Sequence, residues 1–159
     1  MIVTGRYSDT TQRSISASSS ETTVLTGYTV PAYELQGENT IRVRFFGTWQ
    51  TLASTTTITW RVKLGGTTIL TSTAQQSGST SQIDFSGDLT IVGTSTTAQK
   101  VALAVYGKNT GSGAALTYGL IDTGTGSRDM RLDRALTVTA QFSDGSSMDI
   151  EHASYILEQ

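Results

Sequence analysis

The sequence predicts an all-β protein, an eight-stranded antiparallel β-sandwich with jelly-roll-like connections and an extended N-terminal arm. Three observations lead to this fold class. Apolar residues recur with a period of two, and no long segment has the 3.6-residue period of a helix. The chain holds 29 Thr and 19 Ser among 159 residues, and Thr suits a half-exposed pleated surface. Short turn sequences separate the alternating segments, as in sandwiches and barrels.

The expected strands follow one another at short intervals. Pro31, the only proline, stops the first of them, and the glycine pair Gly65-Gly66 supplies the two positive φ angles that a type I′ hairpin turn requires. We expect a bend or bulge at Gly87, and "SDGSS" is a turn sequence between the last two strands. The predicted strands are residues 22–30, 40–47, both halves of a hairpin at 57–70, 81–92, 99–106, 135–142 and 148–157.

Two segments lie outside this pattern. Residues 1–20 are polar and end in "SISASSS", so we expect an extended arm that becomes ordered on a partner, followed by a sandwich domain over residues 21–159. Residues 107–134 contain six glycines and are interpreted as a long connection. A further short strand at "ALTYGLID" within this connection stays an open alternative.

Composition argues against several function classes. Charged residues make up 15% of the chain and the net charge is -2, whereas a nucleic-acid-binding domain usually has a clear basic excess. The absence of cysteine excludes disulfides and thiolate metal sites and fits assembly in a reducing cytosol. No run of 18 apolar residues is present, and "MIVTGRYSDT" lacks the apolar core of a signal peptide. We therefore expect neither a nucleic-acid nor a membrane partner.

The residues that usually carry catalysis form no recognisable motif. His152, the only histidine, is expected on the same strand face as Met148, Ile150, Ser154 and Ile156, as a packed or edge residue. Its sequence neighbours Asp149 and Glu151 would point to the opposite face, which argues against a metal site. A carboxylate pair assembled across the fold stays open as a hydrolase alternative, because the aspartates are scattered: Asp84, Asp88, Asp122, Asp129, Asp133 and Asp144.

Aromatic and charged residues suggest binding instead. Trp60 follows the inward parity of its strand, whereas Trp49 lies just after a predicted strand and is a candidate for an exposed sugar platform, a core cap or a subunit contact. "RDMRLDRAL" carries charges of both signs, which suits a solvated loop or inter-subunit ion pairs. Two predicted strands carry basic residues on their outward faces. If these strands are neighbours in one sheet, the four side chains are expected to form a basic strip: Arg42, Arg44, Arg61 and Lys63.

Three stretches carry a family resemblance when taken together: "ETTVLTGYTVPAYELQGENTIRVRFFGTW", "ITWRVKLGGTTIL" and "LTVTAQFSDGSSMDIEHASYILEQ". They resemble the opening strands, the next hairpin and the closing hairpin of small jelly-roll domains in structural proteins of tailed bacteriophages. Phe142 stands where that family often has Trp, and Met148-Asp149 where it often has Asn-Thr. The resemblance runs from residue 21 to the C-terminus and is loose between residues 74 and 134.

The resemblance implies a non-enzymatic virion component without cofactors. Head decoration or cement proteins of this kind form homotrimers on the outer capsid surface, bind the major capsid protein, and assemble in the host cytoplasm. The lack of heptads and repeats favours this type over a fibre, and a receptor- or carbohydrate-binding fibre domain is the alternative. We expect capsid or subunit contacts at seven residues: Arg6, Tyr7, Arg13, Trp49, Arg128, Arg131 and Arg134.

Overall fold

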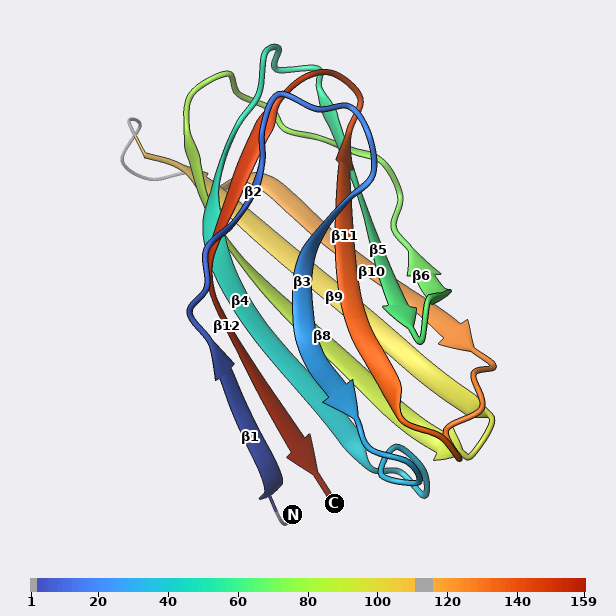
Figure 1. Cartoon of the computed structure of the whole chain (residues 1–159). Coiled ribbons are helices and arrows are strands. Elements are labelled where there is room, and N and C mark those ends of the chain that lie inside the picture. The colour runs from blue at the N-terminus through green and yellow to red at the C-terminus, as the bar shows by residue number, and fades with distance from the viewer. Residues whose placement is uncertain (1–2, 111–115) are drawn as a thin grey trace.

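The computed structural model describes residues 3–110 and 116–159 and consists of two antiparallel β-sheets stacked as a sandwich (Figure 1). The all-β prediction is confirmed, since the described residues form strands, turns and loops without a helix. Accordingly, this part of the chain contains no helix that could span a membrane.

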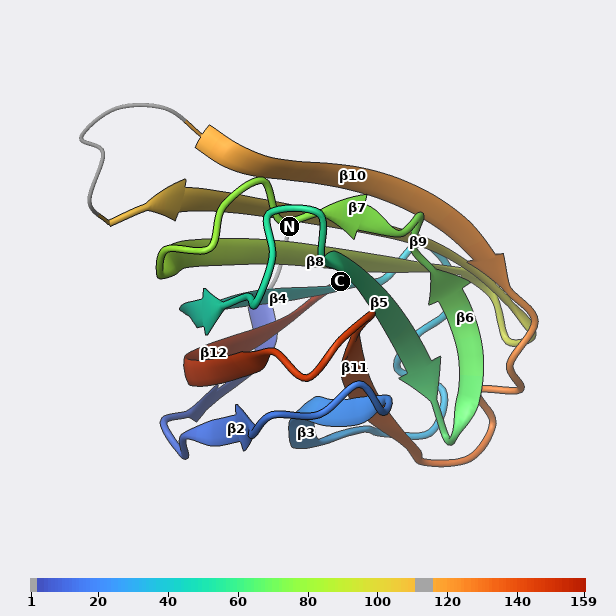
Figure 2. The same cartoon turned by 90° about the horizontal axis from the view of Figure 1, so that it is seen from above.

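The larger sheet, sheet A, has seven strands: β1 (Val3–Asp9), β2 (Arg13–Ile15), β4 (Thr40–Gln50), β8 (Ile83–Ser95), β9 (Ala98–Asn109), β10 (Leu116–Gly126) and β12 (Ser147–Glu158). Their order is β1–β12–β4–β8–β9–β10, and β2 also pairs with β12. Sheet B has five strands: β3 (Thr22–Val30), β5 (Thr57–Leu64), β6 (Thr67–Thr71), β7 (Gln75–Gln76) and β11 (Arg134–Phe142). Their order is β3–β11–β5–β6, and β7 also pairs with β5. Figure 2 shows the two layers from above.

Each of the eight predicted strands has a counterpart in the structure. β3 has the expected bounds, and Gly65 and Gly66 have φ angles of 53° and 81°, so the predicted hairpin turn is confirmed. The expected bulge at Gly87 is wrong, because β8 pairs without a break through this residue on both sides. Gly87 has a different role: the ring of Phe45, its cross-strand partner, occupies the space where a Cβ would lie.

The described residues form twelve strands, whereas the sequence predicted eight. One additional strand, β10, occupies much of the expected connection and pairs with β9 along its length. Another, β7, is a two-residue pairing with β5. The other two, β1 and β2, place residues 3–9 and 13–15 of the expected arm on the edge of β12, where they form one interrupted edge strand. The first described segments of the chain therefore lie in sheet A, beside its last strand.

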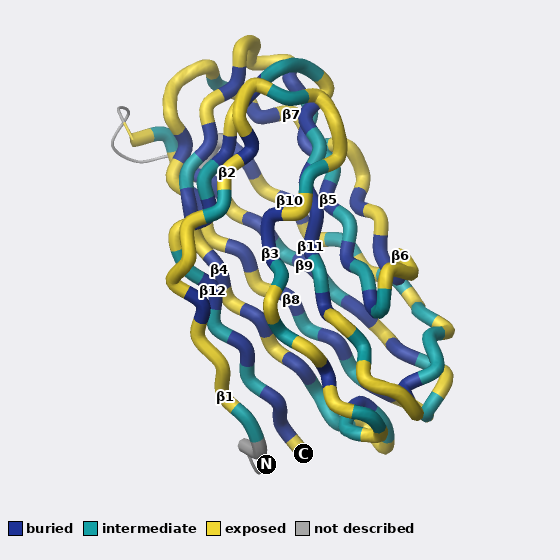
Figure 3. Tube along the Cα trace, in the orientation of Figure 1, coloured by how far each residue is buried: buried dark blue, intermediate teal, exposed yellow. Residues whose placement is uncertain are grey.

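The core lies between the two sheets, and buried and exposed residues alternate along the strands (Figure 3). An aromatic cluster fills the sandwich between sheet A and β5. The rings of Trp49 and Phe85 lie 4.6 Å apart, and Trp60 and Phe85 lie 5.8 Å apart. Trp60 Nε1 donates to the buried hydroxyl of Tyr118 over 3.3 Å, which satisfies both polar atoms inside the core. Trp60 is fully buried, as its strand parity predicts.

Candidate interaction face

The outer face of sheet A is the candidate site, and four adjacent rows of its side chains cross the strands between β1 and β10. The rows follow from the residue pairing, since directly paired residues of an antiparallel sheet point to the same side. The first row, from β12 to β10, is His152, Phe46, Ser86, Tyr106 and Gly119. The second, from β1, is Ser8, Ser154, Arg44, Asp88, Ala104 and Ile121. The third is Arg6, Ile156, Arg42, Thr90, Ala102 and Thr123, and the fourth, from β12, is Glu158, Thr40, Val92, Lys100 and Thr125.

We call these four rows the sheet A face. Three large apolar side chains on it are exposed to solvent: Phe46 by 47%, Tyr106 by 36% and Ile121 by 69%. Many of their neighbours in the rows are Ser, Ala, Thr or Gly, so the large side chains stand above a low surface. Hollows lie between the larger residues of this face.

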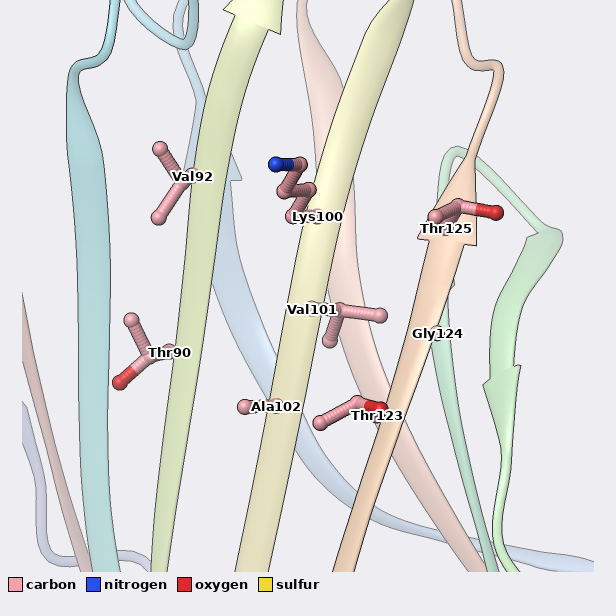
Figure 4. A pocket seen from close by; sticks show the side chains of 8 residues that line it. All are labelled: Thr90, Val92, Lys100, Val101, Ala102, Thr123, Gly124 and Thr125. Carbon is pink, nitrogen blue, oxygen red and sulfur yellow. The ribbon is translucent and has the colours of Figure 1, made fainter.

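One hollow, of about 440 Å³, lies over β8, β9 and β10 (Figure 4). Its floor is made by Ala102 with Thr90 and Thr123 on either side, and Val92, Lys100 and Thr125 form the next row. Lys100 brings the only charged group to this lining. We refer to this hollow with Tyr106 and Ile121 as the apolar half of the sheet A face.

A second hollow, of about 320 Å³, lies over β12, β4 and β8. Arg44 Nε and Asp88 Oδ1 form an ion pair of 3.0 Å on one side, and on the other the rings of Phe46 and His152 lie 5.5 Å apart. Two serines, Ser86 and Ser154, also line the hollow, together with Phe45 and Gly87. We refer to this hollow as the polar hollow.

A β-bulge in β12 places His152 at the polar hollow. The register between β12 and β4 shifts between Ile150 and His152, so the parity of β12 inverts there. Met148 and Ile150 are buried, whereas His152 points outward with Ser154; the prediction that His152 shares a face with Met148 and Ile150 is therefore wrong. Gly47 lies opposite the bulge, where a Cβ would overlap the backbone carbonyl of Asp149.

The expected basic strip does not form, because its strands belong to different sheets. Arg42 and Arg44 lie on β4 in sheet A, and Arg61 and Lys63 lie on β5 in sheet B. Each of the four has a carboxylate partner within the chain. Arg42 pairs with Glu158 at 3.1 Å and Arg44 with Asp88, whereas Arg61 and Lys63 both pair with Glu21.

Glu21 is the centre of a polar network on the outer face of sheet B. It accepts a hydrogen bond from Lys63 Nζ and one of 2.8 Å from Thr139 Oγ1, and Arg61 lies 3.4 Å away. Arg61 in turn donates to Gln141 Oε1 over 3.1 Å. The hydrogen bonds from Lys63 and Thr139 lower the pKa of Glu21 below its ordinary value.

Trp49 does not provide the exposed aromatic platform that the sequence left open. Its side chain is 1% exposed, its ring stacks near Phe85 and Tyr118, and its Nε1 faces Ser77 Oγ at 3.4 Å. The predicted strand ended at Gly47, but β4 continues to Gln50, and the alternation carried past Gly47 turns Trp49 inward.

The three arginines of "RDMRLDRAL" contact residues of the same chain. The side chain of Arg131 binds Asp129 through two hydrogen bonds of 2.9 and 3.0 Å, which lowers the pKa of the Asp129 carboxyl to about 2. Arg134 Nε donates to the Asp129 carbonyl over 2.8 Å, and the Arg128 guanidinium lies over the Gly65 turn. Arg131 and Arg134 therefore stabilise the segment before β11 through Asp129, and Arg128 joins this segment to the β5–β6 turn.

The remaining three predicted contact residues lie on the N-terminal edge. Arg6 is exposed on the sheet A face, whereas Tyr7 covers the open edge of the sandwich with its ring 5.5 Å from that of Tyr155. Arg13 pairs with the buried carboxylate of Asp9. Burial raises the pKa of Asp9, but hydrogen bonds from the Thr11 amide and from Arg13 outweigh it and leave the pKa lowered. The seven predicted residues are thus distributed over the core, this edge and the loop before β11.

Sequence reasoning missed the three exposed residues Phe46, Tyr106 and Ile121. Strand parity could have found the first two, since Phe46 continues the outward row of Arg42 and Arg44, and Tyr106 follows the inward Val105. Over the residues that the structure describes, no three His, Asp or Glu side chains gather as metal ligands would. Fold and face together define the class: an all-β sandwich whose principal feature is an exposed sheet surface. The chain matches no protein-family model and no curated protein.

Proposed function

We propose that the chain is a non-enzymatic structural protein of a tailed-bacteriophage virion. In this proposal it is a decoration or cement protein that forms a homotrimer, binds the major capsid protein on the outer capsid surface, and bridges neighbouring capsid subunits. It would join the particle in the host cytoplasm. The proposal rests on the resemblance of its opening, middle and closing segments to phage jelly-roll domains, and on one structural observation, the apolar half of the sheet A face.

We infer a jelly-roll connectivity with an added hairpin. In a jelly roll, a long hairpin is rolled up, so that the first strand pairs with the last and successive strands pair inward. The pairing of this chain is nested in the same way: β1 and β2 with β12, β3 with β11, β4 with β8, and β5 with β6. β9 and β10 would then be an insertion that widens sheet A. This order supports the family resemblance at the level of topology.

The apolar half of the sheet A face is the surface that we assign to a second copy of the chain. Permanent homo-oligomer interfaces are more apolar than transient ones. Ile121, at 69% exposure, and the hollow around Ala102 provide apolar area with a single lysine in its lining. A lasting contact of this kind needs roughly 1,000 Å² or more of total buried area.

Attachment to the capsid would then gain from the trimer. Once one subunit is bound, the other two are held at high effective concentration near their own sites, so weak individual contacts sum to a tight attachment. Capsid subunits bridged in this way resist separation, because internal pressure must break these contacts as well as those of the shell.

Two measurements test the proposal. Native mass spectrometry of the purified protein is expected to give a trimer, and the protein is expected to cosediment with capsids of the phage that encodes it. Ile121→Asp is expected to convert the trimer to monomers, whereas Leu132→Asp, a matched change at a side chain of 60% exposure in the loop before β11, is expected to leave it intact. A monomer that stays in the supernatant would contradict the proposal.

A further inference from the structure

The polar hollow has two chemically different walls. On one side Phe46 and His152 present two rings, and on the other Arg44 and Asp88 present a guanidinium and a carboxylate. These walls belong to neighbouring outward rows, two residues apart along each strand. Three positions in each of these two rows, on β12, β4 and β8, form a frame of six residues around the hollow. The spacings of an antiparallel sheet make this frame roughly 7 Å by 10 Å, which is the size of one sugar ring with its substituents.

We propose that this hollow binds one neutral pyranose unit of a saccharide. A sugar ring has an apolar C–H face and a rim of hydroxyl groups. Phe46 is 47% exposed and offers a ring to the C–H face, while the opposite wall and the two serines offer polar groups to the rim.

The charges of the hollow favour a neutral ligand. Arg44 and Asp88 compensate one another at 3.0 Å, so an anion attracted by the guanidinium would also meet the carboxylate. The guanidinium only donates hydrogen bonds and the carboxylate only accepts them. A pair of adjacent sugar hydroxyls donates and accepts at once, so it matches this ion pair.

The exposure of the ion pair makes it available to a ligand. The side chains of Arg44 and Asp88 are 78% and 57% exposed, in contrast to 24% and 31% for Lys63 and Glu21 on sheet B. Ser86 and Ser154 stand at opposite corners of the frame, where short side chains leave the hollow open. Each serine hydroxyl both donates and accepts a hydrogen bond.

The proposal is independent of the capsid proposal, because the polar hollow and the apolar half are separate parts of the sheet A face. On a capsid protein such a site would add saccharide binding to capsid attachment. The same site on a fibre domain would serve receptor recognition. A binding experiment tests the saccharide site itself, whichever of these two roles it serves.

The test is saccharide titration of the full chain followed by amide NMR. The probes are free glucose, galactose and N-acetylglucosamine, with dextran as a neutral polymer and dextran sulfate as its charged counterpart. We expect a neutral probe to bind with millimolar affinity and to shift the amides of residues 44–46, 86–88 and 152–154. The free sugars and dextran together distinguish recognition of a single unit from recognition of a polymer.

Variants make the proposal falsifiable. Phe46→Ala and Asp88→Asn are each expected to weaken binding by about tenfold or more, through loss of the ring contact and of the charged acceptor. Tyr33→Ala, at an aromatic side chain of 53% exposure in the loop after β3, outside both the polar hollow and the apolar half, is expected to retain binding. The proposal is overturned if no neutral probe binds, if only dextran sulfate binds, or if Tyr33→Ala weakens binding as much as Phe46→Ala. Thermal unfolding of each variant verifies that the fold is retained.

Discussion

The outer faces of the two sheets are both formed by alternating strands, yet they differ in what their side chains contact. On sheet B, Glu21 joins Lys63, Arg61 and Thr139 into one network that extends to Gln141. On the sheet A face, aromatic and aliphatic side chains stand exposed beside hollows. The chain itself thus supplies the contacts of one face, whereas the other presents groups that a partner can cover.

The ion pairs on the two faces differ in their exposure to solvent. Lys63 and Glu21 are less than one-third exposed and share their environment with a buried threonine, whereas Arg44 and Asp88 are mostly exposed. Solvent screens exposed pairs and weakens their contribution to stability. Sequence patterns alone would treat these pairs as equivalent, since both are charges at outward positions of a strand.

The largest expected effect comes from comparing the two sides of β4. Trp49→Ala would leave a cavity in the aromatic core and is expected to reduce the free energy of unfolding by about 3–5 kcal/mol. Phe46→Ala, on the outward side of the same strand, is expected to cost less than about 1 kcal/mol, because the ring already contacts solvent. Denaturant unfolding of both variants measures the difference, and equal losses would contradict the assignment of Phe46 to a partner-binding face.

The second-largest expected effect tests whether the N-terminal segment belongs to sheet A in solution. Ile15 on β2 is 2% exposed, so Ile15→Ala is expected to lower the free energy of unfolding by about 2–4 kcal/mol. Ser14→Ala, at its exposed neighbour, is the control and is expected to change stability by less than about 0.5 kcal/mol. If residues 1–20 form a free arm in solution, both substitutions will be equally harmless.

Alternation predicts the layers of this fold but not the rows of its candidate site. The inward and outward residues of β4, β5 and β9 follow directly from their period of two. The polar hollow, by contrast, requires Phe46, Ser86 and His152 to be neighbours. That depends on register between strands far apart in the chain, which no single strand encodes.

The N-terminal edge and the bulge escaped prediction for a related physical reason. Asp9 pairs with Ala153 and Arg13 with Ile150, so residues 10–12 interrupt the edge strand opposite the bulge of β12. Each interruption conceals the alternation of its own segment. Gly47 was the one available signal, because a glycine within an alternating strand often marks a bulge or a close backbone approach.

On sheet B, Glu21→Gln is expected to lower the free energy of unfolding by about 1 kcal/mol near neutral pH, because it removes the charge that Lys63 and Arg61 share. The pKa of Glu21 is lowered in the folded state, so its contribution is fully present above the unfolded value, about 4.5, and is lost as pH falls through the folded value. The stability difference between the two proteins should therefore shrink in acid. A difference that is constant with pH would exclude an ionised Glu21 as its source.

The smallest expected effect on stability is that of Asp88→Asn, the corresponding change on the sheet A face. Because Arg44 and Asp88 are mostly exposed, the variant is expected to lose less than about 0.5 kcal/mol at neutral pH, half or less of the loss in Glu21→Gln. The same change is expected to weaken saccharide binding strongly. If Asp88→Asn instead destabilises the fold as much as Glu21→Gln, the ion pair on the sheet A face stabilises the sandwich as the Glu21 network does. The contrast between the two faces would then disappear.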